Sequence, residues 1–525
     1  MTKKQRSLIG GISILGFAGL ICKVVGVLYR IPLANHIGSA GMGVYNQVFP
    51  TYNLMLAVSS AGIPVAISRM VAGNLAQGHA RSARRTFRIA LVLLSALGFI
   101  STLVMVLFSV RFAQATGTEG SRAGFIMIAP SLFFVCVMSA FRGYMQGQRR
   151  MWPTAISQLI EQVGKVAVAL PLAYMGMERG GYVLGAAGAL LGTSIAEGVA
   201  LMYMVVDYWT VEPGMARAVR RDTSAPMGRK AIARELLVTA IPITIGASIV
   251  PLAGAVDSFM LVRQMKVYLP EVEALSRYGI YGLVLSLINV PTALAMAMSS
   301  NLVPAISAKR ARQDQEGVRR DAATGIRMAM VVGLPSSVGM SLLAHPILTL
   351  LFGREYSAEQ LRMGADLLQI SSLTIVVFTL VQATSGILQG MRKQRIPMYT
   401  LAAGIVVKIA INYTAVNRPE INIGGAPYAS LACYLLSGGL NLYYVMRYTG
   451  LSWSWREMAL KPGFATLVMA LPVALVNHLM GERLGRSWLL MGMVLAAAVA
   501  VYMLAVLKTG AVRRSELPGR LSGRK

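Results

Sequence analysis

An acid and a base stand one helical turn apart within an apolar segment of this sequence. The stretch ISQLIEQVGKVAVALPLAY, residues 156–174, carries no charge except those of Glu161 and Lys165. Their i,i+4 spacing allows an ion pair along one face of a helix, which would neutralise both side chains. The alternative is that Lys165 faces an anionic ligand, because ionisable residues inside a membrane-spanning segment are costly and are candidates for functional sites.

Three more cations lie inside apolar segments. Lys408, in TLAAGIVVKIAINYTAV, has no acid one turn away, and both it and Lys165 fall near the middle of a span. Lys23 and Arg30 lie two turns apart on roughly the same face of the first apolar segment, although Arg30 could instead extend to the membrane interface. Acids at comparable depth are few, chiefly Glu161, Glu197 and Asp257. If these cations share a cavity, it is net positive and suits a phosphate or pyrophosphate attached to an apolar tail.

The candidate site therefore consists of two sets of residues. The candidates for substrate binding are Lys23, Arg30, Lys165 and Lys408. The candidates for supporting or coupling roles are Glu161, Asp257, Asn46, Arg142, Gln146 and Gln389. Bends in the helices that carry them are predicted at Pro32, Pro64, Pro242, Pro251 and Pro291, because proline removes a backbone hydrogen bond.

Enzymatic chemistry finds no support in the sequence. The four histidines and three cysteines are scattered, and their spacing fits neither a metal site nor a disulfide framework. The sequence contains no nucleophile elbow, phosphate-binding glycine loop or paired-carboxylate motif. We therefore expect a transporter rather than an enzyme, with no catalytic residue, cofactor or metal.

Membrane-spanning helices must position the candidate residues. The chain has 525 residues, a mean hydropathy of +0.59 and only 14% charged residues, against about 25% in soluble domains. About 20 apolar residues cross a bilayer, so the sequence predicts an all-α polytopic membrane protein with fourteen transmembrane helices. The apolar windows are residues 8–35, 44–68, 87–110, 123–146, 153–175, 182–206, 235–262, 278–303, 325–350, 364–390, 397–416, 425–446, 462–480 and 487–507.

The formal charge of +29 is unevenly distributed. Lys and Arg gather in alternate loops, on the side that also holds both termini, and the positive-inside rule places that side in the cytoplasm of a bacterial cell. No cleavage site follows the basic N-terminus, so the apolar run from Leu8 is expected to be a retained span. Nucleic acid is not an expected partner, because the basic residues separate apolar runs instead of forming a face on a soluble module.

An internal repeat relates the two halves of the chain. AFRGYMQGQRRMWP, residues 140–153, reappears as ATSGILQGMRKQRIP, residues 383–397, and PVAISRMV from Pro64 resembles PAISAKRA from Pro304. Chance similarity between apolar helices is the alternative explanation. Repeated halves of this kind place substrate between them. The predicted division is an N-terminal lobe at 1–210, a basic cytoplasmic linker at 211–234, a C-terminal lobe at 235–450, and two further helices with a basic tail at 451–525.

Two of these segments resemble a known family. GMGVYNQVFPTYNLMLAVSSAGIPVAISRMVA, residues 41–72, and GYMQGQRRMWPTAISQLIEQ, residues 143–162, are similar to the polysaccharide transporter branch of the multidrug/oligosaccharidyl-lipid/polysaccharide (MOP) exporter superfamily. That branch includes stage V sporulation protein B and the MurJ-type lipid II flippases of Gram-positive bacteria. The resemblance implies two pseudo-symmetric six-helix lobes around a V-shaped cavity, two additional C-terminal helices, and alternating access by rocking of the lobes.

The resemblance transfers only in part to individual residues. Arg30 matches an arginine that lipid II flippases carry in the first helix. The positions of three further charged residues of those flippases are occupied here by His36, Tyr45 and Ser286. We therefore hypothesise that Lys23, Lys165 and Lys408 supply positive charge instead.

We therefore expect a flippase for an undecaprenyl-pyrophosphate-linked sugar, with lipid II as the expected substrate. The expected partners are this lipid-linked anionic glycan, the phospholipid bilayer and cell-wall synthesis proteins. Three alternatives stay open: an exporter of another lipid-linked polysaccharide unit, a drug/cation antiporter, and a wall-synthesis or sporulation scaffold that transports nothing. An antiporter would need acids facing the N-terminal cavity, which are scarce in the first four spans.

Overall fold

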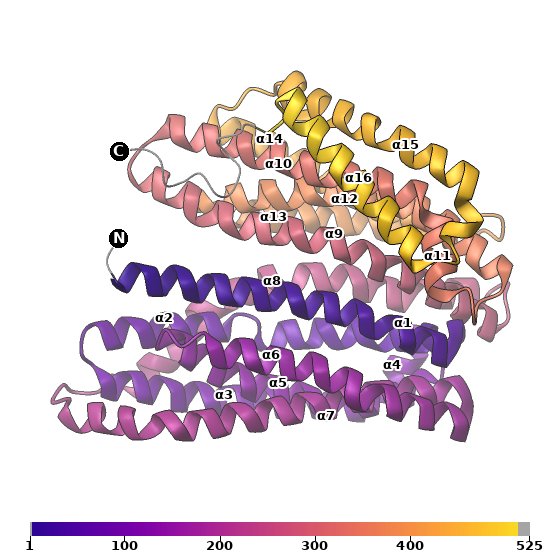
Figure 1. The fold of residues 1–525 in the computed structure, drawn as a ribbon. Coiled ribbons are helices and arrows are strands. Elements are labelled where there is room, and N and C mark those ends of the chain that lie inside the picture. The colour runs from indigo at the N-terminus through magenta and orange to yellow at the C-terminus, as the bar shows by residue number, and fades with distance from the viewer. Residues whose placement is uncertain (1–2, 513–525) are drawn as a thin grey trace. The chain divides into compact units, whose positions relative to one another are not determined.

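The computed structural model describes the backbone of residues 3–512 and the side chains of residues 18–512 other than Leu20, Lys23 and Val211 (Figure 1). Within those residues the chain is all-helical and contains no strand, which confirms the predicted all-α fold. Among the described residues, eleven candidate spans are long and apolar enough to cross a membrane. Two of them, of 53 and 59 residues, are each long enough to cross twice, and the helix Gly425–Thr449 is a further candidate. These helices are compatible with the fourteen predicted spans.

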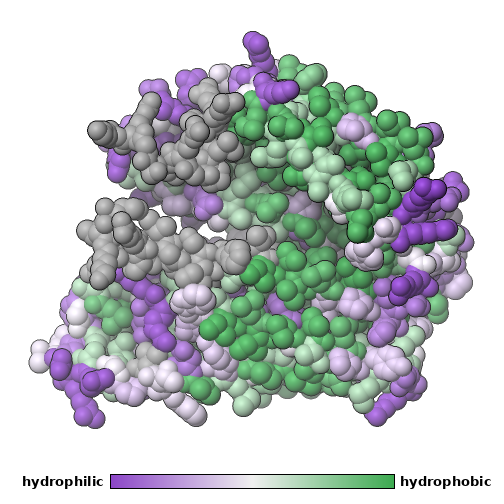
Figure 2. All heavy atoms as spheres, viewed as in Figure 1, coloured by the Kyte–Doolittle hydropathy of each residue, from purple (hydrophilic) through white to green (hydrophobic). Residues whose placement is uncertain are grey.

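The chain divides by packing into two compact units, Met1–Gly279 and Ile280–Lys525. The described helices of the N-terminal unit are α1 (Lys3–Ser60), α2 (Ile63–Ala76), α3 (Ala80–Leu107), α4 (Ser109–Thr116), α5 (Ser121–Gly147), α6 (Trp152–Gly164), the π-helical turn η1 (Lys165–Ala169), α7 (Leu170–Arg221), α8 (Arg229–Met265) and the start of α9 (Glu271–Ala311). On the face shown in Figure 2, hydrophobic side chains cover the middle of this unit and hydrophilic ones gather toward the helix ends. This distribution is typical of a membrane-spanning bundle.

Helix α5 lies at the centre of the N-terminal unit, where it packs against α1, α2, α3 and α7. An aromatic cluster of Phe87, Phe141, Tyr144 and Tyr208 joins α3, α5 and α7, with ring centroids between 4.3 and 6.0 Å apart. Such ring contacts add to the hydrophobic burial of the same side chains. Helix α8 packs along α1 in this unit.

The C-terminal unit contains the rest of α9 and the helices that follow it. These are α10 (Gln315–Leu342), α11 (Ala344–Phe352), α12 (Ala358–Gly390), α13 (Arg395–Val416), the 3₁₀ turn η2 (Asn422–Gly424), α14 (Gly425–Thr449), the π-helical turn η3 (Arg456–Leu460), α15 (Lys461–Leu484) and α16 (Trp488–Thr509). Helix α12 packs against α10 and α14, and α13 packs against α14. Helices α15 and α16 pack against each other, and α15 also contacts α10.

The internal repeat has a structural counterpart in each unit. Helices α5 and α12 end at Gly147 and Gly390. In both cases the second residue after the helix is a non-glycine in the left-handed region, Arg149 with φ 63° and Arg392 with φ 58°. The N–H of Arg149 donates to Gln146 O at 2.9 Å, and that of Arg392 donates to Gln389 O at 2.9 Å. The same unusual backbone at matching positions is difficult to attribute to chance, because few side chains other than glycine adopt it.

The paired glycines of the repeat occupy close helix contacts in both units. A Cβ at Gly143 would lie 2.8 Å from Pro64 O of α2, and a Cβ at Gly386 would lie 2.6 Å from Ser299 Oγ of α9. Each glycine therefore permits close packing against the helix that carries the other part of the repeat.

We expect Gly143→Ala and Gly386→Ala each to destabilise the protein by about 1–3 kcal/mol, the usual cost of overpacking a tight contact. The matched control is Gly439→Ala in α14, where nothing lies within 4 Å of the new Cβ. The melting temperatures of the three variants are measured by thermal unfolding of the purified proteins in detergent. Equal melting temperatures for Gly143→Ala and Gly439→Ala would contradict the packing argument.

Non-helical backbone inside the described helices occurs at Gly38, at Gly180 and Gly181, and at Met480 of α15, and at none of the predicted prolines. Helix α1 loses helical backbone at Gly38, with φ 67° and ψ −178°, and α7 loses it at Gly180 and Gly181. Pro32, Pro242, Pro251 and Pro291 lie inside helices, whereas Pro64 lies at the start of α2. Glycine has no Cβ and accepts a left-handed backbone, so it permits the sharper reversals.

The non-helical segment between α7 and α8 is shorter than the polar stretch at 211–234 from which the linker was predicted. Residues 211–221 continue α7, and the non-helical connection is Asp222–Gly228. The Asp222 carboxylate accepts hydrogen bonds from the Ser224 hydroxyl at 2.6 Å and from the Arg81 N–H at 2.8 Å. These bonds stabilise the ionised form and lower the pKa of Asp222 to about 2. The connection is therefore held by an ionised carboxylate at every pH above about 4.

Candidate substrate-binding site

Small residues bring the helix that carries Lys165 close to the helix that carries Glu197. A Cβ at Gly164 would lie 2.6 Å from the Cβ of Ala196, and a Cβ at Gly192 would lie 2.2 Å from the Cα of Ala169. Lys165 opens the π-helical turn η1, and such turns occur frequently at functional sites. Because Lys165 follows Gly164 and Glu197 follows Ala196, the two charges come from neighbouring positions of the α6–α7 hairpin.

Glu161 forms its ion pair with Arg142 of α5. The Arg142 Nη2 lies 2.5 Å from Glu161 Oε1, and the same guanidinium donates to Ser157 Oγ at 2.8 and 3.0 Å. The described side chains do not form the i,i+4 pair between Glu161 and Lys165 that the spacing allowed. A guanidinium presents several donors in one plane, so it can bind the acid and the hydroxyl together.

Lys165 is left with a charge that no neighbour neutralises directly. Its side chain is half-buried and makes no hydrogen bond or ion pair with any residue that the structure describes. Its charge acts on Glu197 and on Cys22, as does the charge of Glu161. Lys165 therefore lies within electrostatic range of α1, α6 and α7.

Glu197 was recognised in the sequence as an intramembrane acid but was not included in the candidate site. It is 4% exposed and accepts hydrogen bonds from the Tyr52 hydroxyl at 3.1 and 3.2 Å. The Ser131 hydroxyl in turn donates to Tyr52 Oη at 2.7 Å. The signal that could have identified it is its position in LLGTSIAEGVALMYMVV, where it is the only charge.

Arg30 reaches this region through aromatic rings. Its Cζ lies 5.7 Å from the ring centroid of Tyr45 and 5.6 Å from that of Phe49, distances at which a cation is attracted to a ring face. The Phe49 ring lies 5.8 Å from that of Tyr52, the residue that binds Glu197. The Lys23 side chain lies outside the described residues.

These residues form one network in the N-terminal unit, which we call the internal polar cluster. Its members are Arg30, Tyr52, Arg142, Glu161, Lys165 and Glu197. Three members are cations and two, Glu161 and Glu197, are acids, so the cluster formally carries more positive than negative charge. Glu161 is paired with Arg142, and Glu197 is hydrogen-bonded to Tyr52. The cluster can therefore attract an anion, and phosphate oxygens match both the ammonium and the guanidinium.

The other candidates lie apart from the cluster's contacts. Asn46 is 6% exposed, and its backbone carbonyl accepts from the Tyr278 hydroxyl at 3.1 Å. Gln146 Nε2 donates to Thr154 Oγ1 at 3.4 Å, and Asp257 is buried in α8 with an interacting neighbour. Within the C-terminal unit, Lys408 is 5% exposed in α13 and also has an interacting neighbour, whereas Gln389 is exposed near the end of α12.

Comparison with known proteins identifies the family. Residues 8–310, more than half of the chain, match the family model described as polysaccharide biosynthesis protein. The chain belongs to this polysaccharide biosynthesis protein family. Residues 242–414 of this family member also match the MatE model, which agrees with the MOP superfamily resemblance drawn from the sequence.

Curated relatives and a solved structure cover nearly all of this family member. Lipid II flippase MurJ of Bacillus subtilis (strain 168) is 25% identical, with 98% of each chain covered. Stage V sporulation protein B of the same organism is 23% identical, with 98% of this chain and 97% of the relative covered. The structure of lipid II flippase MurJ in an inward closed conformation superposes with a TM-score of 0.67 at 12% identity, covering 94% of this chain and 97% of that one. MOP superfamily membership and its fold are thereby confirmed.

Proposed function

We propose that this protein is a flippase that carries an undecaprenyl-pyrophosphate-linked sugar, with lipid II as its preferred substrate, from the cytoplasmic to the outer leaflet of a bacterial cytoplasmic membrane. The observation that carries the proposal is Lys165, a cation within a membrane-spanning segment that no described residue neutralises directly. A ligand with an anionic headgroup and an apolar tail can neutralise that charge while its tail stays in lipid. The names of the two Bacillus relatives support this substrate class.

In this proposal the residues have distinct roles. Lys165 and Arg30 bind the diphosphate, and Lys23 and Lys408 add positive charge along the path. The Arg142–Glu161 pair holds α5 against α6, so that the hairpin carrying Lys165 keeps its position. Gln146, Asn46, Asp257 and Gln389 have supporting or coupling roles on the helices around them. Alternating access exposes the cluster first to one side of the membrane and then to the other.

The topology belongs to the same proposal. Both termini lie in the cytoplasm, as the distribution of Lys and Arg predicts. The repeated halves supply one pathway, and cell-wall synthesis proteins are the expected protein partners.

The test uses a bacterium depleted of its own lipid II flippase. This protein is expressed at a matched membrane level, and an enzyme that cleaves lipid II is added outside the cell. We expect cleavage to rise from the depleted baseline toward the level of undepleted cells, because lipid II reaches the outer leaflet. If a well-expressed protein restores no cleavage, lipid II is not its substrate.

A parallel arm separates the open alternatives. Cells that lack a flippase for another undecaprenyl-linked glycan are complemented with the same plasmid, and surface glycan is measured. Restoration there alone assigns a different lipid-linked unit. Restoration in neither strain favours the scaffold or the antiporter.

A further inference from the structure

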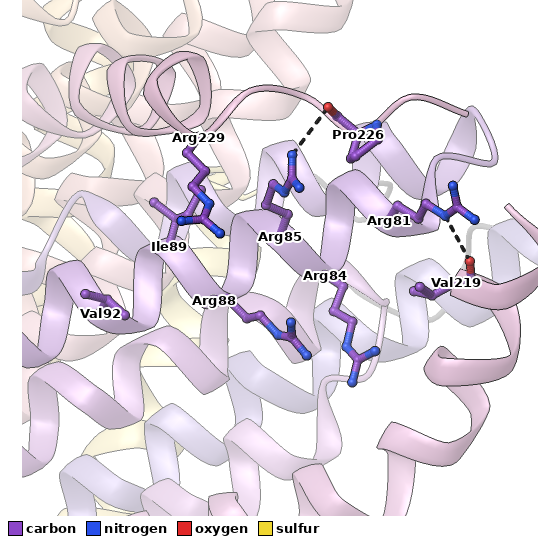
Figure 3. Close-up of a pocket in the computed structure, with 9 residues that line it drawn as sticks. All are labelled: Arg81, Arg84, Arg85, Arg88, Ile89, Val92, Val219, Pro226 and Arg229. Carbon is purple, nitrogen blue, oxygen red and sulfur yellow. Dashed lines mark hydrogen bonds between the residues drawn. The ribbon is translucent and has the colours of Figure 1, made fainter. Parts of the chain in front are cut away.

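A second basic site lies at one end of the N-terminal unit, away from the internal polar cluster. A pocket of about 540 Å³ is formed by the first turns of α3, the end of α7 and the connection to α8. Figure 3 shows four arginines along the N-terminal part of α3 and a fifth arginine on α8 around it. The lining residues are Arg81, Arg84, Arg85, Arg88, Ile89, Val92, Val219, Pro226 and Arg229. We call this the α3 arginine pocket.

The arginines of the α3 arginine pocket are placed where helix electrostatics oppose them. Arg81, Arg84, Arg85 and Arg88 follow i, i+3, i+4 and i+7 spacing, which puts like charges on one face. Arg81 also lies in the first turn of α3, where the helix dipole is positive and a cation is unfavourable. An anion bound between these residues would remove both repulsions.

Local partners satisfy only some of these guanidinium groups. Arg84 forms an ion pair with Glu212. Arg85 Nη1 donates to the Met227 carbonyl at 3.0 Å, and Arg81 Nε donates to the Val219 carbonyl at 3.3 Å. These contacts attach α3 to the end of α7 and to the Asp222–Gly228 connection, and they fix the shape of the pocket.

Arg88 and Arg229 are left available for a ligand. Both are exposed, and neither makes a hydrogen bond or ion pair with another residue in the part of the chain that the structure describes. They come from different helices, α3 and α8, and both line the same pocket. Two guanidinium groups arranged in this way can bind oxygens of one phosphate.

The apolar lining of the pocket continues along the lipid-facing side of α3. Helix α3 has 28 residues, or about 42 Å at about 1.5 Å per residue, which exceeds the roughly 30 Å hydrocarbon core. The helix therefore extends beyond the core, and we place its basic first turns, which precede the apolar part, at the headgroup level. Val92 is 70% exposed, and Phe99 and Ile100, further along the helix, are 61% and 54% exposed. In a membrane-spanning helix, such exposed apolar residues face acyl chains.

We propose that the α3 arginine pocket binds the headgroup of an anionic glycerophospholipid, whose acyl chains lie along the Val92 face of α3. The cationic rim and the apolar wall meet in one pocket, which matches a phosphodiester joined to a diacyl tail. A soluble polyanion would use the arginines but leave the apolar wall unexplained. The proposal does not depend on the transported substrate, since none of the internal polar cluster lines this pocket.

The test measures thermal unfolding of the full-length protein in a neutral detergent. Dioleoyl phosphatidylglycerol, dioleoyl phosphatidylcholine or inorganic phosphate is titrated, and the apparent dissociation constant is taken from the rise in melting temperature. We expect phosphatidylglycerol to stabilise the wild-type protein more than phosphatidylcholine does. Arg88→Gln/Arg229→Gln should weaken the phosphatidylglycerol effect about thirtyfold, because each basic residue near an anionic surface contributes a factor of about five.

The control is Arg310→Gln/Arg312→Gln, which removes two exposed arginines outside the pocket. It should keep the wild-type response to phosphatidylglycerol. Equal weakening in the two double variants would overturn the proposal, since it would show a general charge effect. Full stabilisation by inorganic phosphate alone would also overturn it, since it would show an ion site rather than a lipid site.

Discussion

Arg30→Gln/Lys165→Gln is expected to reduce lipid II exposure at the cell surface at least about a hundredfold, at unchanged membrane level. The two residues supply the cations that we assign to the diphosphate, and no other described group of the internal polar cluster is available to replace them. Hydrogen bonds to charged groups contribute about 1.5–3 kcal/mol each, and about 3 kcal/mol corresponds to roughly a hundredfold. The external cleavage assay in flippase-depleted cells measures the loss.

The control for this variant removes the same charges elsewhere. Arg111 lies 5.4 Å from the Phe108 ring and Lys393 lies 4.9 Å from the Tyr448 ring, so Arg111→Gln/Lys393→Gln also removes one arginine and one lysine from aromatic faces. It should transport at the wild-type rate. Lys165→Arg, which keeps the charge, should retain part of the activity. Full transport by Arg30→Gln/Lys165→Gln would show that the internal polar cluster does not bind substrate.

Glu161→Gln is expected to destabilise the protein by about 2–3 kcal/mol, because it leaves the Arg142 guanidinium without its acid. Both side chains of the pair are 14% exposed, so solvent cannot replace the lost partner fully. Arg142→Gln should have a similar effect. The double variant should lose less than the sum of the two, since neither charge then remains unpaired. Thermal unfolding in detergent measures the stability of the wild type, the two single variants and the double variant, which together form a double-mutant cycle.

An exposed pair in the same protein provides the comparison. Arg320 and Glu316 have side chains that are 72% and 86% exposed, and they are spaced i,i+4. Glu316→Gln should cost less than about 0.5 kcal/mol, as is typical of exposed pairs. If Glu161→Gln costs no more than Glu316→Gln, the buried pair does not hold α5 against α6.

The fold was predictable because the helices depend on local composition. Apolar windows predicted an all-helical chain with many spans, and the repeat around Gly143 and Gly386 marked two close helix contacts. Helix boundaries were less predictable. The sequence of α7 is polar after residue 210, yet helical hydrogen bonding continues to Arg221, because alanine, methionine and arginine favour a helix whether or not it is in lipid.

The candidate site was predictable only for its separate residues. Spacing along one helix offered Lys165 as the partner of Glu161, whereas the actual partner, Arg142, lies on another helix. The same limit explains Glu197, whose bond to Tyr52 joins residues 145 positions apart. The α3 arginine pocket was visible as a basic segment, but its fifth arginine comes from α8, beyond the connection.

Helix α7 connects the buried acid of the N-terminal unit to its basic end. No described residue between Gly181 and Arg221 leaves the helical conformation, so Glu197 and Arg221 belong to one helix, in which Pro213 removes one backbone hydrogen bond. The 24 intervening steps span about 36 Å at about 1.5 Å per residue. A tilt of about 10° pivoting at Glu197 would therefore displace the far end by about 6 Å, on the geometry of a straight rod. That end is anchored to α3 through Asp222, so a tilt of α7 at the buried acid would also move the basic end of the bundle.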